Sequence, residues 1–109
     1  MPSHPKPIAA HELKARLDAG ERLVVLDVRE PDEVAIGRIA GAVHIPMNEV
    51  PQRLAELDPE APIVAYCHHG MRSHAVGSWL LTQGFAEVYN LNGGIDAWAT
   101  AVEPGMARY

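Results

Sequence analysis

The chain has 109 residues, of which 48% are hydrophobic and 21% charged, and its formal net charge at pH 7 is -5. This length fits one domain with a single hydrophobic core. The acidic balance and the scattered Lys and Arg residues argue against nucleic acid as a partner. No apolar run approaches the roughly 20 residues of a membrane span, so we expect no membrane partner either.

The chain holds one cysteine, Cys67. One cysteine cannot form an internal disulfide, which fits a reducing compartment. The first ten residues, MPSHPKPIAA, lack the apolar core of a secretion signal. We therefore expect a cytoplasmic protein; the alternative is an exported protein whose signal has been removed.

Helical and strand-like segments alternate along the chain. Residues 1–7 and 104–109 are expected to be flexible tails, which leaves one domain at 8–103. Strands are predicted at 23–28, 42–46, 62–67 and 87–91, with a short first strand near 7–9, and helices at 9–20, 49–57, 72–84 and 93–101. This alternation predicts an α/β fold with a mostly parallel sheet and helices on both faces.

The stretch YCHHGMRS, residues 66–73, combines a cysteine with a position that favours chemistry. Ligands of parallel sheets bind beyond the carboxyl ends of the strands, and Cys67 lies at such an end. A short curled loop that leads into a helix turns N–H groups inward, and Gly70 supplies the backbone freedom. The helix N-terminus and Arg72 add positive charge, so we expect a depressed pKa for Cys67 and a reactive thiolate.

The same residues are less typical of an inert core cysteine or of a metal site. A lone cysteine is most often an inert core residue, but histidine, glycine and arginine are poor core neighbours. A metal site would need Cys67, His68, His69 and perhaps His74 to converge, and adjacent residues rarely point at one ion. We therefore expect no metal, and we interpret His68 and His69 as residues at the rim of the loop.

Asp27 and Arg29 follow the strand at 23–28 and have a structural interpretation. Asp27 ends a buried strand, and Arg29 has Glu30 and Glu33 nearby as partners. We expect both residues to brace the edge of the sheet beside the cysteine loop.

Three stretches resemble signature segments of the single-domain rhodanese (thiosulfate sulfurtransferase-like) family: LDVREPDEVAIGRIAGAVHIP (26–46), YCHHGMRS (66–73) and LNGGIDAWA (91–99). They occur in the family's order, and the resemblance covers about residues 8–101. Two departures, Arg38 in place of a frequent histidine and His44 in place of asparagine, fall on scaffold positions.

The resemblance implies a rhodanese-like domain with a parallel five-stranded sheet flanked by helices on both faces. It also implies a sulfurtransferase in which Cys67 carries a persulfide between a sulfur donor and a thiophilic acceptor such as cyanide, a thiol or a protein, with no cofactor. The donor is a small anion such as thiosulfate, or a persulfide that a protein delivers. The binding loop would consist of His68, His69, Gly70, Met71, Arg72 and Ser73.

Two rival functions share this loop. Phosphatases of this fold place five residues between cysteine and arginine, whereas four lie between Cys67 and Arg72, so a phosphatase or an arsenate reductase is the weaker reading. A non-enzymatic rhodanese-like binding module is the other alternative. Some such modules have lost the cysteine, and this chain keeps it.

Overall fold

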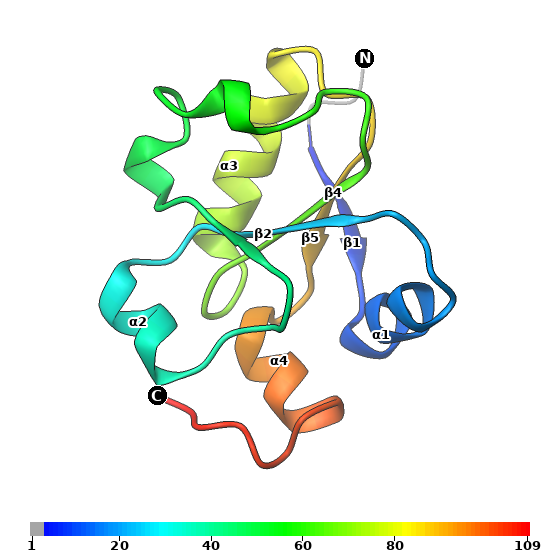
Figure 1. The fold of residues 1–109 in the computed structure, drawn as a ribbon, viewed down its shortest axis with the longest axis vertical. Coiled ribbons are helices and arrows are strands. Elements are labelled where there is room, and N and C mark those ends of the chain that lie inside the picture. The colour runs from blue at the N-terminus through cyan, green and yellow to red at the C-terminus, as the bar shows by residue number, and fades with distance from the viewer. Residues whose placement is uncertain (1–3) are drawn as a thin grey trace.

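A five-stranded sheet runs through the middle of the molecule, and all of its strands are parallel (Figure 1). The structure is a computed structural model, and it describes residues 4–109. The strand order is β1-β5-β4-β2-β3. The strands are β1 (Lys6–Ile8), β2 (Val24–Asp27), β3 (Val43–His44), β4 (Ile63–Tyr66) and β5 (Val88–Leu91). The predicted α/β fold with a parallel five-stranded sheet is confirmed.

Helices cover both faces of this sheet (Figure 1). On one face lie α1 (Ala10–Asp18) and α4 (Gly94–Ala101), which contact each other. On the other face lies α3 (Met71–Thr82), which packs against β4, β5 and the short 3-10 helix η1 (Met47–Glu49). The short helix α2 (Pro31–Ile36) follows β2 and stands beyond the carboxyl end of that strand.

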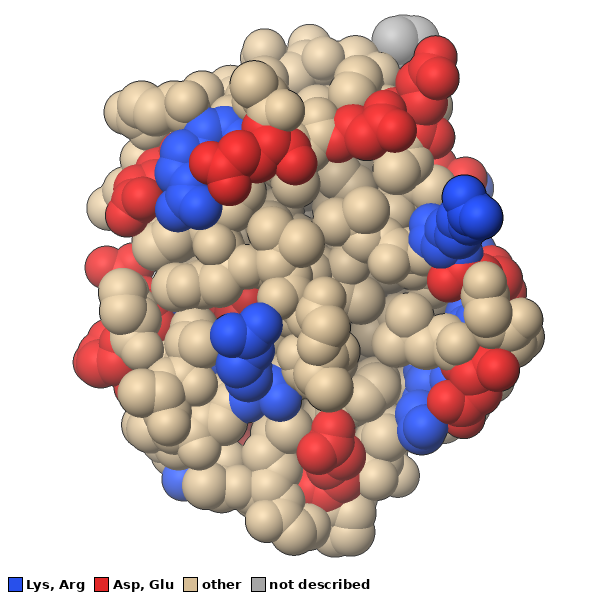
Figure 2. Space-filling view, viewed as in Figure 1, with Lys and Arg blue, Asp and Glu red and all other residues tan. Residues whose placement is uncertain are grey.

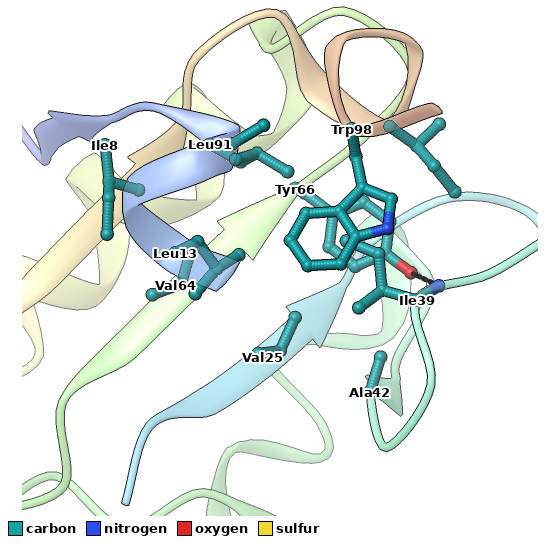
Figure 3. Packing of buried hydrophobic residues seen from close by; sticks show 11 residues of the cluster. Ile8, Leu13, Val25, Ile39, Ala42, Val64, Tyr66, Leu91 and Trp98 are labelled. Atoms are coloured by element: carbon teal, nitrogen blue, oxygen red, sulfur yellow. Dashed lines mark hydrogen bonds between the residues drawn. The ribbon is translucent and has the colours of Figure 1, made fainter. Parts of the chain in front are cut away.

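Side chains on the two faces of the sheet belong to two separate hydrophobic cores. Successive residues of a strand point to opposite faces, and Val64 and Tyr66 accordingly join the core under α1 and α4. Figure 3 shows this core, in which Trp98 of α4 lies beside Tyr66 and Ile39. Cys67 belongs to the second core, which lies under α3.

The sequence prediction was wrong for residues 49–57. A helix was expected there, but the segment forms turns and the two 3-10 helices η1 and η2 (Leu54–Glu56). Short isolated helices are marginal, and tertiary packing decides their form. Here Val50 and Leu57 are anchored in the core under α3, and short 3-10 turns connect these anchors.

The helix α2 was not predicted as an element of its own, although its start has a clear sequence signal. Pro31 occupies the first turn, and the side chains of Glu30 and Glu33 form a reciprocal capping box with the backbone. This capping fixes the direction in which Glu33 leaves the helix, which matters for the site below.

The two expected tails have different surroundings. Residues 1–3 of the expected tail at 1–7 lie outside the described residues, and Lys6 and Pro7 belong to β1. Residues 104–109 lie against the domain through contacts of Met106, Arg108 and Tyr109.

Charges of both signs alternate over the visible surface. Figure 2 shows Lys and Arg side chains beside Asp and Glu on this face, rather than one basic stripe. Among residues 4–109, no helix has the length and apolar character needed to cross a bilayer.

Candidate active site

Cys67 lies directly after β4, at the carboxyl edge of the sheet. Its side chain is 2% exposed, so the sulfur sits at the base of the loop that follows. The loop turns at Gly70, whose φ of 118° lies in the left-handed region that glycine adopts readily. The helix α3 begins at the next residue, Met71, so its N-terminus faces the sulfur.

Hydrogen bonds converge on the sulfur from the loop and from α3. The Gly70 N–H donates to Cys67 Sγ over 3.1 Å, and the Ser73 hydroxyl lies 3.4 Å from the same atom. Burial alone would raise the pKa of the Cys67 thiol. The Ser73 hydroxyl and the backbone N–H groups of Ser73, Gly70 and Arg72 act in the opposite direction and outweigh burial, so the pKa is lowered.

N–H groups at the start of α4 bind the backbone carbonyls of the cysteine loop. The N–H of Ile95 donates to the Cys67 carbonyl over 2.9 Å, and the N–H of Asp96 donates to the His68 carbonyl over 3.2 Å. Gly94 makes this approach possible, because a Cβ at this position would overlap the Cys67 and His68 carbonyls. The loop carbonyls are thus bound on the outside of the turn.

Asn90, near the carboxyl end of β5, clamps the loop from the neighbouring strand. Its side-chain amide donates to the Gly70 carbonyl over 3.0 Å, and its Oδ1 lies 2.5 Å from the Ser73 hydroxyl, which shares its one proton between this oxygen and Cys67 Sγ. Since a carbonyl can only accept, the first bond fixes the orientation of the amide. Asn90 therefore keeps the Ser73 hydroxyl close to the sulfur of Cys67.

Arg72 does not stand free at the mouth of the loop. Its guanidinium donates to both carboxylate oxygens of Glu33, over 2.6 and 2.8 Å. This pair lowers the pKa of Glu33 to about 2 and raises the pKa of Arg72. The fixed charge expected beside the sulfur is therefore compensated by a carboxylate of α2, and Arg72 ties the end of the loop to that helix.

Asp27 and Arg29 form a buried ion pair beneath the site. Arg29 is fully buried and donates to both carboxylate oxygens of Asp27, over 3.0 and 2.7 Å. The Tyr66 hydroxyl donates to the same carboxylate over 2.7 Å and accepts from the Ile39 N–H (Figure 3). The expected partner of Arg29 was therefore wrong: its guanidinium pairs with Asp27 and meets Glu33 only at the backbone carbonyl.

The remaining residues of the predicted loop point outward. Met71 is 86% exposed, His69 is exposed and His68 is half-buried. The rings of His68 and His69 are stacked, with centroids 3.9 Å apart. These positions fit the expected rim of the loop.

His68, His69 and Asp96 bring ligand-type atoms within 4.8 Å of one another, a spacing that a metal ion could bridge. Stacked imidazole rings direct their nitrogen lone pairs side by side rather than toward one ion. The Arg108 guanidinium already binds Asp96, with Nη2 2.6 Å from the carboxylate. A positive charge at this distance opposes a metal cation, and the arrangement is a poor metal site.

Three residues that organise the site were absent from the sequence prediction as site residues: Glu33, Tyr66 and Asn90. Each reaches the site from a different element: Glu33 from α2, Tyr66 from the opposite face of β4, and Asn90 from β5. A signal existed for Asn90, because an amide next to the end of an apolar strand lies at the same sheet edge as Cys67.

The model of the Rhodanese-like domain family matches residues 9–101, which is most of the chain. The chain belongs to the rhodanese-like domain family. The resemblance seen in the three signature stretches is thereby confirmed.

Curated relatives and solved structures support this membership. The chain is 42% identical to a putative sulfurtransferase, YtwF, of Bacillus subtilis over 91% of this chain and 95% of that protein. It is 36% identical to the thiosulfate sulfurtransferase GlpE of Stutzerimonas stutzeri over 85% and 84% of the two chains. A rhodanese-like domain protein of Staphylococcus aureus superposes with a TM-score of 0.83 at 31% identity, over 95% of this chain and 98% of that one.

Membership and the identity to these relatives place the chain among the rhodanese-type sulfurtransferases. Enzymes of this type use a sulfur donor and a sulfur acceptor.

Proposed function

We propose that the protein transfers a sulfane sulfur from thiosulfate or a persulfide donor to a thiophilic acceptor through a persulfide on Cys67. The observation that carries the proposal is the environment of the Cys67 sulfur. Cys67 Sγ has a lowered pKa and lies where loop and helix N–H groups converge. A thiolate is the nucleophilic form of cysteine.

The first half-reaction loads the cysteine. The Cys67 thiolate attacks the outer sulfur of thiosulfate, a new S–S bond forms, and the original S–S bond breaks with its electron pair leaving on sulfite. The loop N–H groups that hold the thiolate also favour the anionic persulfide. No proton needs to move when the thiolate attacks, so no general base is required at this step.

The second half-reaction unloads the cysteine. Cyanide or a thiolate attacks the outer sulfur of the persulfide, and the Cys67 thiolate leaves with the electron pair of the broken S–S bond. The hydrogen bonds from Gly70 and Ser73 that lower the pKa of Cys67 make it a better leaving group.

The loop would hold a donor anion mainly by its N–H groups. Arg72 is neutralised by Glu33, so its role in donor binding is to fix the end of the loop rather than to present a free charge. His68 and His69 form the rim on the opposite side of the turn. A donor with little charge, such as a persulfide of a thiol or of a protein, would not need a free cation at this site.

The phosphatase alternative is less favoured by the same contacts. A phosphatase loop needs an arginine that grips the phosphate oxygens, and Arg72 is held by two bonds to Glu33. The loop between Cys67 and Arg72 also holds only four residues, His68, His69, Gly70 and Met71. We therefore place phosphate-ester and arsenate chemistry behind sulfur transfer.

The test is thiocyanate formation from thiosulfate and cyanide. We expect the wild type to form thiocyanate, and we expect Cys67→Ser to form none above the uncatalysed rate while keeping its circular dichroism spectrum. His11→Ala, which changes an exposed histidine of α1, serves as the control and should retain full activity. Turnover in folded Cys67→Ser would refute the assignment of the nucleophile.

A further inference from the structure

The segment that follows α4 lies outside the part of the chain that the family model matches, which ends at residue 101. Figure 1 shows it running from the end of α4 across the molecule to α2, where Tyr109 lies. We call residues 106–109 the strap. Its course brings it to the edge of the sheet that carries Cys67.

The first part of the strap is anchored to the domain at two points. Met106 packs against the core under α1 and α4. It also lies close to Gly37, since a Cβ built on that glycine would be only 3.2 Å from Met106 Cγ. Arg108 binds Asp96 at the start of α4, over 2.6 and 3.1 Å. The cavity between the strap and α4 measures only about 10 Å³, about the room of one water molecule.

Tyr109 at the end of the strap touches both walls of the candidate site. Its ring stacks on His68, the residue after the cysteine, with centroids 4.0 Å apart and planes 16° apart. Its hydroxyl donates to Glu33 Oε2 over 2.7 Å and accepts from Arg29 Nη1 over 3.1 Å. Tyr109 therefore bridges the cysteine loop and α2.

Arg72, which follows the cysteine loop, shares a carboxylate partner with Tyr109. Its guanidinium binds Glu33, the carboxylate that also accepts from Tyr109. Tyr109 and Arg72 therefore meet at Glu33, and the tyrosine ring reaches from there to His68, the residue next to Cys67.

We propose that Tyr109 is a specificity-determining residue that narrows the approach to Cys67 and favours small sulfur donors and acceptors over bulky ones. The ring spans from His68 of the loop to Glu33 of α2 and is held there by the His68 stack and two hydrogen bonds. The effect on donor choice rests on the proposed function. The effect on how easily reagents reach the Cys67 thiol does not depend on it.

Access can be measured without any sulfur transfer, because Cys67 is the only cysteine and every thiol reagent reports on it. The rate constants of alkylation by iodoacetamide, a small reagent, and by N-(1-pyrenyl)maleimide, a bulky one, are compared in each variant. We expect Tyr109→Ala to raise the bulky-to-small rate ratio about tenfold, equivalent to the loss of a barrier of about 1.4 kcal/mol. Tyr109→Phe, which keeps the ring, should leave the ratio near that of the wild type.

Tyr89→Ala is the matched control. Tyr89 is a tyrosine whose hydroxyl likewise binds a glutamate, Glu87, but it is half-buried within β5 and packs against the core under α1 and α4. Its removal should not change the ratio. An unchanged ratio in folded Tyr109→Ala, or an equal rise in Tyr89→Ala, would overturn the proposal.

A second measurement tests whether Tyr109 also affects the choice of sulfur donor. The kcat/KM values for glutathione persulfide and for thiosulfate are compared, and Tyr109→Ala should shift preference toward the bulkier persulfide. If the wild type transfers sulfur from neither donor, the proposed function fails and the alkylation ratio still decides the role of Tyr109. If sulfur is transferred but neither ratio changes in Tyr109→Ala, only the proposal about Tyr109 fails.

Discussion

At the scale of single residues, the reactivity of Cys67 depends on a balance between burial and hydrogen bonding. Burial disfavours the thiolate, and the hydroxyl of Ser73 together with three backbone N–H groups favours it more strongly. Because backbone donors are fixed by the turn at Gly70, the side chain of Ser73 is the part of this balance that substitution can remove cleanly.

We predict that the alkylation rate of Cys67 reaches its plateau at a lower pH than the rate of an ordinary cysteine, whose pKa is near 9.0. The sign follows from the lowered pKa, since the thiolate then persists to more acidic pH. Ser73→Ala removes a donor to Sγ and should move the midpoint to higher pH. Iodoacetamide rates measured across the pH range provide the check.

Ser78→Ala, a change in a serine of the same helix α3 that is not bonded to the sulfur, controls for effects on the helix. A midpoint at or above that of free cysteine in the wild type would contradict the hydrogen-bond account of Cys67.

The cysteine loop was predictable from sequence because its parts are contiguous. Cys67, Gly70 and Ser73 lie within seven residues, and a strand followed by a helix fixes where such a loop sits. The partners of the loop were not predictable in the same way. Asn90 and Glu33 reach it from other elements, and only the three-dimensional packing shows which of many polar residues meet.

At the scale of elements, the short helix α2 acts as a brace for the loop. It has no buried residue of its own, so it is held by its capping box and by Glu33, which binds Arg72 at the start of α3. The same carboxylate accepts from Tyr109. Loss of this one side chain would separate α2 from the loop.

We predict that Glu33→Gln lowers the free energy of unfolding by about 1.5 kcal/mol at pH 7, the range for hydrogen bonds to a charged group that is partly exposed to solvent. The folded-state pKa of Glu33 is about 2, below its ordinary 4.5. Its stabilisation is therefore present above pH 4.5 and is lost as the pH falls toward 2. Urea unfolding at several pH values measures the difference.

Glu56→Gln is the matched control for Glu33→Gln. Glu56 also binds an arginine through both oxygens, Arg53, but the pair is exposed to solvent. Its loss should change stability little at any pH. A difference between wild type and Glu33→Gln that stays constant from pH 7 to pH 2 would show that the charge of Glu33 does not stabilise the fold.

The elements themselves show where sequence patterns suffice. Continuous apolar runs identified β2 and β4, because strands buried on both faces leave no other pattern. The segment at 49–57 was expected to form a helix. Its form is set instead by where Val50 and Leu57 are buried, which no local pattern contains.

At the scale of the whole molecule, a buried polar cluster joins the sheet to the edge that carries the site. Arg29 and Asp27 are almost fully buried and paired, and Tyr66 connects them to β4. A buried charge without a partner is costly, so the cluster makes the position of this sheet edge depend on all of its members.

We predict that Asp27→Ala lowers the free energy of unfolding by roughly 3–5 kcal/mol, because it leaves the Arg29 guanidinium buried and unpaired. Asp18→Ala, which removes the exposed pair of Asp18 with Lys14, is the control and should have an effect of about 0–0.5 kcal/mol. Denaturant unfolding followed by circular dichroism gives both values. Equal effects of the two substitutions would contradict the structural role assigned to Asp27.

The central claim is that Cys67 carries the transferred sulfur, and intact mass spectrometry tests it most directly. The wild type and Cys67→Ser are incubated with thiosulfate, measured, and then treated with cyanide. We predict that the wild type alone gains the mass of one sulfur atom and loses it to cyanide as thiocyanate is released. An adduct of the same mass on Cys67→Ser, or a sulfur on the wild type that cyanide cannot remove, would contradict the account.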